Sequence, residues 1–358
     1  MAESIAPAWR LVVDGVDISA RAGHRLLGLT LTEKRGAEAD ELALEISDHD
    51  GRLALPPKGG VCTLQLGVTD TRTGRALAMI DKGSFKIDEV GHSGSPDKVS
   101  VRARSADLTG AFRRRRSQSW PAAPAAGEAA QPVRLGDVLD EIAARNGLTA
   151  VVAPDMAERT LPHLAQTSES DAAFLARLGR RFDAVATVKA GRLLFGPAGA
   201  GKAMSGADLQ TAEITRRDGD QHAYKAPDRG AFAGVIAQWR DRAAAQTKEV
   251  VVGSEENARR LSRVYASEDA ARQAAEAAMG RIRRGKAEFS LSLARGRPDL
   301  FAERPARVSG FKPQIDGAGW IIATATHTIA GDGGLTTRIE CELGGGNDEQ
   351  GEEASATP

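Results

Sequence analysis

The sequence predicts an α+β fold, mainly β, with two strand-rich regions that flank a small α+β middle region. In the first and last thirds of the chain, hydrophobic and polar residues alternate with a period of two, which is typical of strands with one buried face. Between them the hydrophobic spacing is that of helices. The 39 glycines among 358 residues favour many turns and short strands.

Antiparallel strands are expected throughout residues 1–112, the first predicted domain. Asp14-Gly15 predicts a hairpin turn, because both central positions of such a turn need a positive φ. Further strands are predicted where buried positions alternate with exposed ones, at Leu27, Leu29 and Leu31, at Leu42, Leu44 and Ile46, at Cys62, Leu64, Leu66 and Val68, and at Val99 and Val101. Six or more such strands indicate a barrel or a sandwich.

Residues 113–132 are predicted to form a linker between domains. Four consecutive arginines, Arg113 to Arg116, open it, and a Pro- and Ala-rich stretch follows. Such a composition is not expected to pack.

The middle α+β domain is predicted over residues 133–206. Its first helix is indicated by apolar residues at helical spacing, namely Leu135, Val138, Leu139 and Ile142. A second helix is predicted to begin at Ser168, with Asp171 as its capping partner. A hairpin with Ala190-Gly191 at its turn completes the domain.

Strands return in residues 207–343, the second strand-rich domain. Segments 234–240 and 249–252 predict a ribbon, and a helix is expected over 267–284 because acidic residues begin it and arginines end it. Alternation then predicts strands over 320–329 and 335–343. The acidic tail, 344–358, is expected to be disordered.

Composition excludes several classes of function. The 48 basic and 48 acidic residues give a net charge of zero, so the chain lacks the field that attracts nucleic acid or an anionic membrane. Aromatic residues, at 4%, are too few for a broad stacking surface. Cys62 and Cys341 fit neither a disulfide framework nor a metal spacing. With no signal peptide pattern and no membrane span, the chain is expected to fold in a cytoplasm.

The sharpest motif is Gly196 to Ala203, which fits the phosphate-loop spacing G-x-x-x-x-G-K and follows a predicted strand. In a nucleotide site Lys202 would contact phosphate. However, Ala203 replaces the Ser or Thr that should bind magnesium, and no apolar helical stripe follows. A Gly/Ala-rich joint is the preferred interpretation, and nucleotide binding stays open as a minor alternative.

Other candidate residues have simpler structural interpretations. Asp48-His49-Asp50-Gly51 suggests a metal or acid/base cluster, but Asp and Gly are ordinary turn residues between strands. His327 shares a strand face with apolar residues, which favours a core or interface histidine. The Arg113 to Arg116 run is expected to face solvent or a partner. No residue is assigned a catalytic, cofactor-binding or metal-binding role.

The order of several modest segments resembles the phage late control gene D protein family. The resemblance covers nearly the whole chain up to the Gly-rich tail, and no segment is diagnostic alone. The segments are Ile46–Pro57, Leu64–Gly67, Val138–Leu148, Leu161–Asp171, Phe174–Leu178, Leu293–Leu300 and Ser309–Pro313.

This resemblance implies a baseplate hub of a contractile phage tail or a related injection particle, similar to the hub part of VgrG proteins. It implies two β-barrel-like tube domains per subunit that flank the middle domain, and a homotrimeric ring between the tail tube and a spike. Because the chain ends in a short acidic tail, the spike is expected to be a separate polypeptide. The implied location is the virion tail, assembled in the bacterial cytoplasm.

The resemblance transfers no catalytic residue, cofactor or membrane anchor, and no sequence-specific nucleic-acid binding is expected. Barrel-edge strands around Cys62 to Val68 and Leu335 to Leu343 are expected to help close the ring. A tail-associated cell-wall hydrolase is the second hypothesis, although no carboxylate pair stands out.

Overall fold

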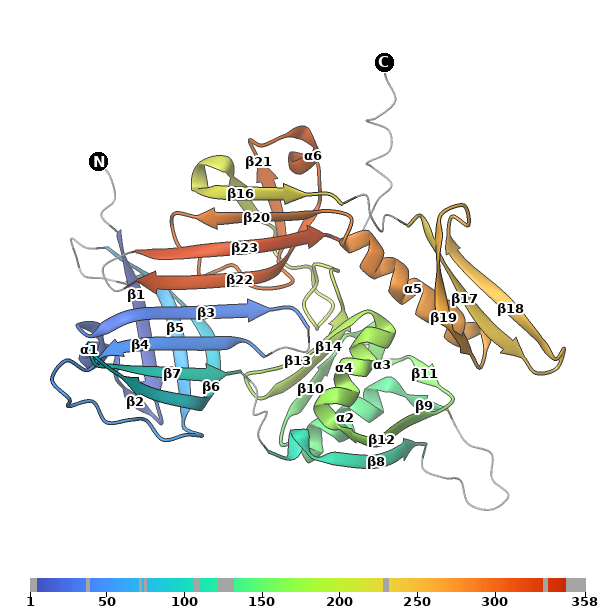
Figure 1. The fold of residues 1–358 in the computed structure, drawn as a ribbon, viewed down its shortest axis with the longest axis horizontal. Coiled ribbons are helices and arrows are strands. Elements are labelled where there is room, and N and C mark those ends of the chain that lie inside the picture. The colour runs from blue at the N-terminus through green and yellow to red at the C-terminus, as the bar shows by residue number, and fades with distance from the viewer. Residues whose placement is uncertain are drawn as a thin grey trace.

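The computed structural model describes residues 5–36, 39–70, 73, 76–105, 110–121, 132–227, 232–330 and 334–345. The expected disorder of the tail from 346 onward and the unpacked segment 122–131 lie outside the described residues. The chain is mainly β, with two strand-rich regions that lie against each other and a compact helical part beside them (Figure 1). Within the described residues, none of the helices is both long and apolar enough to span a bilayer.

The first strand-rich region forms an antiparallel sheet in the order β3-β4-β7-β6-β5-β1-β2. Its elements are β1 (Ile5–Val13), β2 (Val16–Asp17), α1 (Ser19–Gly23), β3 (Leu26–Lys34), β4 (Glu41–Ser47), β5 (Val61–Asp70), β6 (Ala76–Ser93) and β7 (Lys98–Arg104). Asp14 and Gly15 have φ of 47° and 82°, which confirms the predicted hairpin turn. The predicted alternation is confirmed at Leu29, Leu31 and Leu42, which are fully buried. It is wrong at Leu27, which is 46% exposed, because the register shifts between Leu26 and Gly28 and Leu26 is buried in its place.

The second strand-rich region continues the same sheet. Its elements are β15 (Ala212–Thr215), η2 (Arg216–Asp218), β16 (Gly219–Lys225), β20 (Glu288–Leu293), β21 (Pro305–Ser309), α6 (Pro313–Asp316), β22 (Trp320–Ala330) and β23 (Leu335–Leu343). The order β16-β20-β23-β22 leads directly into β3, giving a 13-stranded sheet. β22 pairs with β3 from Thr324↔Lys34 to Ala330↔Gly28.

The prediction of two barrel-like domains is not confirmed. Across the described ranges no closed barrel is found, and the two strand-rich regions share one sheet. β22 and β3, one from each region, hydrogen-bond to each other along this seam. Figure 1 shows the two strand-rich regions side by side along this seam.

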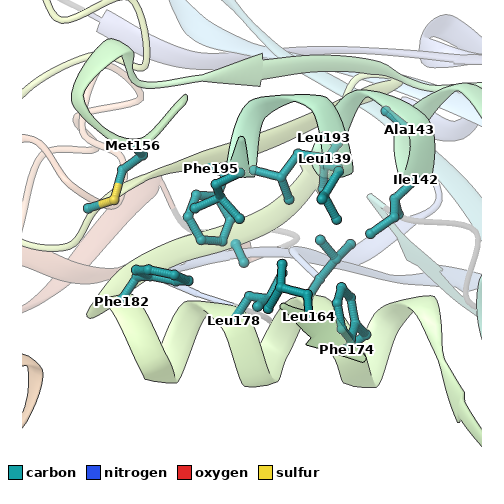
Figure 2. Close-up of a cluster of buried hydrophobic side chains, with 14 of the residues drawn as sticks. Leu139, Ile142, Ala143, Met156, Leu164, Phe174, Leu178, Phe182, Leu193 and Phe195 are labelled. Atoms are coloured by element: carbon teal, nitrogen blue, oxygen red, sulfur yellow. The ribbon is translucent and has the colours of Figure 1, made fainter. Parts of the chain in front are cut away.

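The middle region packs two helices against a three-stranded sheet, β10-β14-β13. Its elements are η1 (Ala111–Arg113), β8 (Arg115–Trp120), β9 (Val133–Arg134), α2 (Leu135–Arg145), β10 (Thr149–Val152), α3 (Pro154–Ala157), β11 (Thr160–Leu161), β12 (Leu164–Ser170), α4 (Asp171–Phe182), β13 (Ala184–Lys189) and β14 (Arg192–Pro197). Figure 2 shows its core, where Leu139, Phe174, Leu178 and Phe195 converge from both helices and the sheet.

Two predictions for this region are wrong. Arg115–Trp120 is not part of an unpacked linker, because it pairs with β12 and buries Trp120 against Phe174, with ring centroids 5.4 Å apart. The helix α4 begins after Ser170, not at Ser168, because the Ser170 hydroxyl accepts the Ala173 N–H at 3.2 Å. Ser168 instead has a φ of 49° within an irregular stretch of β12.

A smaller layer completes the fold. It consists of β17 (Gly234–Asp241), β18 (Gln246–Gly253) and β19 (Ala258–Tyr265), covered by α5 (Glu268–Arg284). The predicted ribbon and helix are confirmed, with Ser267 capping α5. Alanines line the inner face of α5, so the helix approaches the sheet closely; the buried ones are Ala271, Ala275, Ala277 and Ala278.

Candidate functional site

The three larger regions meet at a polar junction of buried and half-buried charged side chains. The junction consists of Glu33, Arg35, Asp40, Lys82, Asp183, Lys189, Arg284, Glu303, His327 and Glu342. These residues come from β3, β6, β13, β22, β23, α5 and the connections between them. Ion pairs at the junction therefore connect segments that are far apart in the sequence.

The most enclosed part of the junction lies across the seam between β3 and β22. Lys82 Nζ donates to Glu33 Oε2 at 2.6 Å, and His327 Nε2 lies 3.1 Å from the same oxygen. His327 is fully buried, and the Lys82 side chain is 3% exposed. Burial favours the neutral carboxyl of Glu33, but the His327 hydrogen bond and the Lys82 charge outweigh it and lower the pKa of Glu33.

Both ring nitrogens of His327 have polar partners. Thr337 Oγ1, which accepts the Arg297 N–H at 2.9 Å, lies 2.9 Å from His327 Nδ1. His327 Nε2 lies 3.1 Å from Glu33 Oε2 and from the Leu300 carbonyl, and 3.2 Å from Lys82 Nζ. The prediction of a core or interface histidine is confirmed.

A second part of the junction involves Arg35, just after β3. It forms ion pairs with Glu303 and with Glu342, the latter at 2.5 Å. Glu303 also accepts the Gly199 N–H at 2.7 Å. One carboxylate thus connects the first region to the loop that follows β14 of the middle region.

In the phosphate-loop motif, backbone groups that would bind a phosphate are already hydrogen-bonded within the chain. The Gly199 N–H, which would face a phosphate, donates to Glu303, and the Ala198 carbonyl accepts from Arg284 at 3.2 Å. The chain then turns back on itself, with Lys202 and Asp208 opposite each other, and no helix follows. This geometry agrees with a joint and gives no support to a nucleotide site.

Two further ion pairs connect the middle region to α5 and to the first strand-rich region. Arg284 of α5 binds Asp183 with both nitrogens, at 2.7 and 2.5 Å. Lys189 pairs with the buried Asp40 at 2.8 Å. Burial raises the pKa of Asp40, and Lys189 offsets this only in part. Sequence reasoning missed all of these partners, because nothing local links them.

The remaining candidates are structural. Asp48 accepts the Leu53 N–H at 3.0 Å and Asp50 pairs with Arg25, which agrees with the turn interpretation. In the described part of the chain, no three His, Cys, Asp or Glu side chains gather closely enough to ligate a metal. Burial raises the pKa of Cys62 to about 11 and that of Cys341 to about 12, so both thiols are inert.

The arginine run has a partly internal role. Arg115 and Arg116 begin β8, and Arg116 Nε lies 3.8 Å from the buried Asp171. Arg113 and Arg114 are exposed. The first two arginines of the run are therefore exposed to solvent, while Arg116 lies against the middle region.

The strands expected to close a ring are not edges. Cys62–Val68 belongs to β5, which lies between β1 and β6, and Leu335–Leu343 is β23, which lies between β20 and β22. The prediction that they are edge strands is wrong, because both already pair on both sides and have no free edge for another subunit. The two ends of the strand path are instead β2 and β16, and the side chains of β16 from 220 to 225 are all exposed.

Comparison with known proteins gives consistent matches. The family described as phage tail baseplate hub (GPD) matches residues 59–333. A probable baseplate hub protein of Escherichia phage 186 is 38% identical, over 95% of this chain and 94% of that protein. A 43 kDa tail protein of a Shewanella oneidensis prophage, 14% identical, has the same fold with a TM-score of 0.64, covering 93% of this chain and 97% of that one.

The fold also resembles that of a bacterial secretion protein. A type VI secretion system component of E. coli is 14% identical, with a TM-score of 0.52, and the match covers 89% of this chain and 73% of that one.

Proposed function

The chain belongs to the phage tail baseplate hub (GPD) family, and we propose that three copies of it form a ring that joins the tail tube to a separately encoded spike. The hub role follows from the family. The trimer, the ring and the two partners are the proposal. The role needs no catalysis, cofactor or metal, and the buried charges serve the architecture.

The observation that carries this proposal is the continuous 13-stranded sheet with its polar junction. A ring that transmits force between a tube and a spike needs subunits whose parts keep one relative orientation. Ion pairs and hydrogen bonds are directional, so buried pairs such as Glu33–Lys82 and Asp183–Arg284 favour a single arrangement. The loop contacts of Glu303 extend this constraint to the middle region.

The exposed strand β16 is the best candidate for contact between subunits. Among the described strands it pairs with β20 alone, and Tyr224 on it is 38% exposed. An unpaired sheet edge is a template for a strand from another chain. Permanent interfaces of this kind bury roughly 2,000 Å² or more, so β16 would supply only part of the contact.

We also propose a domain division that follows the hydrophobic clusters. The middle domain takes in 110–121 as well as the predicted 133–206, because Trp120 belongs to its core. The predicted strand-rich domains, 1–112 and 207–343, share the seam between β3 and β22. The exposed arginines Arg113 and Arg114 and the acidic tail are candidate contact sites for the tube and spike.

Native mass spectrometry of the chain, co-expressed with its tube and spike proteins, tests the trimer. We expect a trimer, and we expect Tyr224→Asp to lower the trimer fraction by roughly tenfold through a charge placed at the interface. Ala243→Asp, in the exposed turn after β17, is the matched control and should leave the trimer intact. Monomer alone in the presence of both partners would overturn the proposal.

A further inference from the structure

The first strand-rich region contains a cavity of about 580 Å³ that the ring and the junction do not use. Its wall is apolar and includes Leu11, Leu44, Cys62, Ile87 and Val101, each at most 5% exposed. Native cores leave few voids larger than a water molecule. Cavities that bind ligands are typically ~300–1,000 Å³ and mostly apolar. Its size and lining therefore indicate a binding cavity.

Cationic side chains line the mouth of this cavity. Arg25 is paired with Asp50 at 2.7 and 2.6 Å. The side chains of Arg21 and Arg52 also line the cavity, and among the described residues neither has a hydrogen-bond or ion-pair partner. Two unpaired guanidinium groups beside an apolar wall fit an occupant that is apolar in its body and anionic at its edge.

The rim of the cavity favours a polypeptide over a small lipid. Leu55 is 55% exposed and lies between Ala54 and Pro56, which both line the cavity. A fatty acid enclosed in the cavity would leave Leu55 in water. A peptide segment can insert one side chain and cover Leu55 with its neighbours.

Exposed apolar residues of this chain that lie beside cations are poor occupants of the cavity. Two of the chain's exposed large apolar residues on other parts of the fold lie next to cations, Tyr224 beside Lys225 and Val264 beside Arg263. Like charges at the mouth would oppose their docking. The sequence from 346 to 358 is acidic but contains no large apolar residue to fill the cavity.

We propose that the cavity receives a segment of another tail protein, in which an apolar side chain inserts and flanking Asp or Glu residues pair with Arg21 and Arg52. The inference rests on the hub function proposed above. It assigns the end of the first sheet near α1 and the loop 52–56 as a docking surface for an acidic, apolar peptide.

Photo-crosslinking in assembled tails tests this docking. The full chain carries p-benzoylphenylalanine in place of Leu55, or in place of Ala243 as the distant control. We expect light to link Leu55 to a different tail protein, at a segment with an apolar residue flanked by Asp or Glu. The charge reversals Arg21→Glu and Arg52→Glu together should lower the yield by at least about fivefold, because they remove both ion pairs.

A blocking variant separates docking from folding. Ala54→Trp places a bulky ring at the exposed mouth and should also abolish the crosslink, while the Tm of the purified chain stays unchanged. Several results would overturn the inference: a crosslink no stronger than at Ala243, a crosslink to a second copy or to the acidic tail, a yield insensitive to charge reversal, or a stoichiometric fatty acid in the purified chain. Absence of the chain from the tails would instead refute the hub function.

Discussion

In the middle region, two helices and a three-stranded sheet enclose aliphatic and aromatic side chains (Figure 2), whereas the regions meet one another across carboxylates and cations that are buried or half-buried. Apolar burial is non-directional and scales with area. Ion pairs require defined positions of both partners. The difference suggests that each region is stabilised by its own core, while the junction specifies how the regions are arranged.

Among these predictions, Lys82→Met is expected to reduce the stability of the junction most. It leaves the Glu33 carboxylate buried without its cation, which costs about 3–5 kcal/mol of unfolding free energy. The double variant Glu33→Gln with Lys82→Met should cost less than this single change, because the amide oxygen of Gln can still accept from His327. Urea denaturation measures both. An equal or greater cost for the double variant would contradict the role of the pair.

The core of the middle region is tested by Leu178→Ala, at a fully buried position between α4 and the sheet. The cavity it leaves should cost about 2–5 kcal/mol. If each region depends on its own core, amide hydrogen exchange should accelerate in α2 and α4 and stay unchanged in β3 and β22. Equal acceleration in both places would show that the regions unfold as one unit.

The pH dependence distinguishes two junction carboxylates. The lowered pKa of Glu33 gives stability that is present above its unfolded pKa, near 4.3, and is lost as pH falls through the lower folded value. The raised pKa of Asp40 has the opposite sign, so its contribution is lost as pH rises. Glu33→Gln should therefore flatten the acid loss of stability, and Asp40→Asn should not, in denaturation series across acidic pH.

The helix cap gives a smaller effect. Ser170→Ala removes the acceptor for the Ala173 N–H and should cost about 1 kcal/mol. Ser168→Ala, the position that the sequence pattern favoured, should change the Tm far less. A larger decrease in Tm for Ser168→Ala than for Ser170→Ala would indicate that the helix begins at Ser168, as the sequence pattern predicts.

The smallest effect is expected at the cysteines. With the pKa of Cys62 at about 11 and that of Cys341 at about 12, neither thiol should react with a thiol reagent in the native chain at mildly alkaline pH. Both should react after denaturation. Rapid labelling of Cys62 in the native protein would show that its sheet opens locally.

The local hydrophobic pattern of the sequence was sufficient to predict most strands and much of the core. The alternation of Leu42 and Leu44 in β4 and the helical spacing in α2 both follow from neighbours in sequence. The pairing of β3 with β22 does not, because Glu33 and His327 are 294 positions apart and no local signal encodes which strand lies beside which. For the same reason the partners of His327 were missed although its burial was predicted.

The run of four arginines led to a wrong prediction for the segment that contains Trp120. Arg113 to Arg116 made the segment look like a linker, yet Arg115–Trp120 packs onto the middle region as β8, where it pairs with β12 and buries Trp120. The exposed faces of that strand tolerate the arginines because only one of its side chains needs to enter the core.

The seam between β3 and β22 also sets the order of events during synthesis. The partner of β3 is encoded at 324–330, so the edge of β3 is unpaired until nearly the whole chain has left the ribosome. The middle region, made entirely before that point, can form its core first. A hub polypeptide cut short before residue 324 would lack the strand that pairs with β3 and could not complete the sheet.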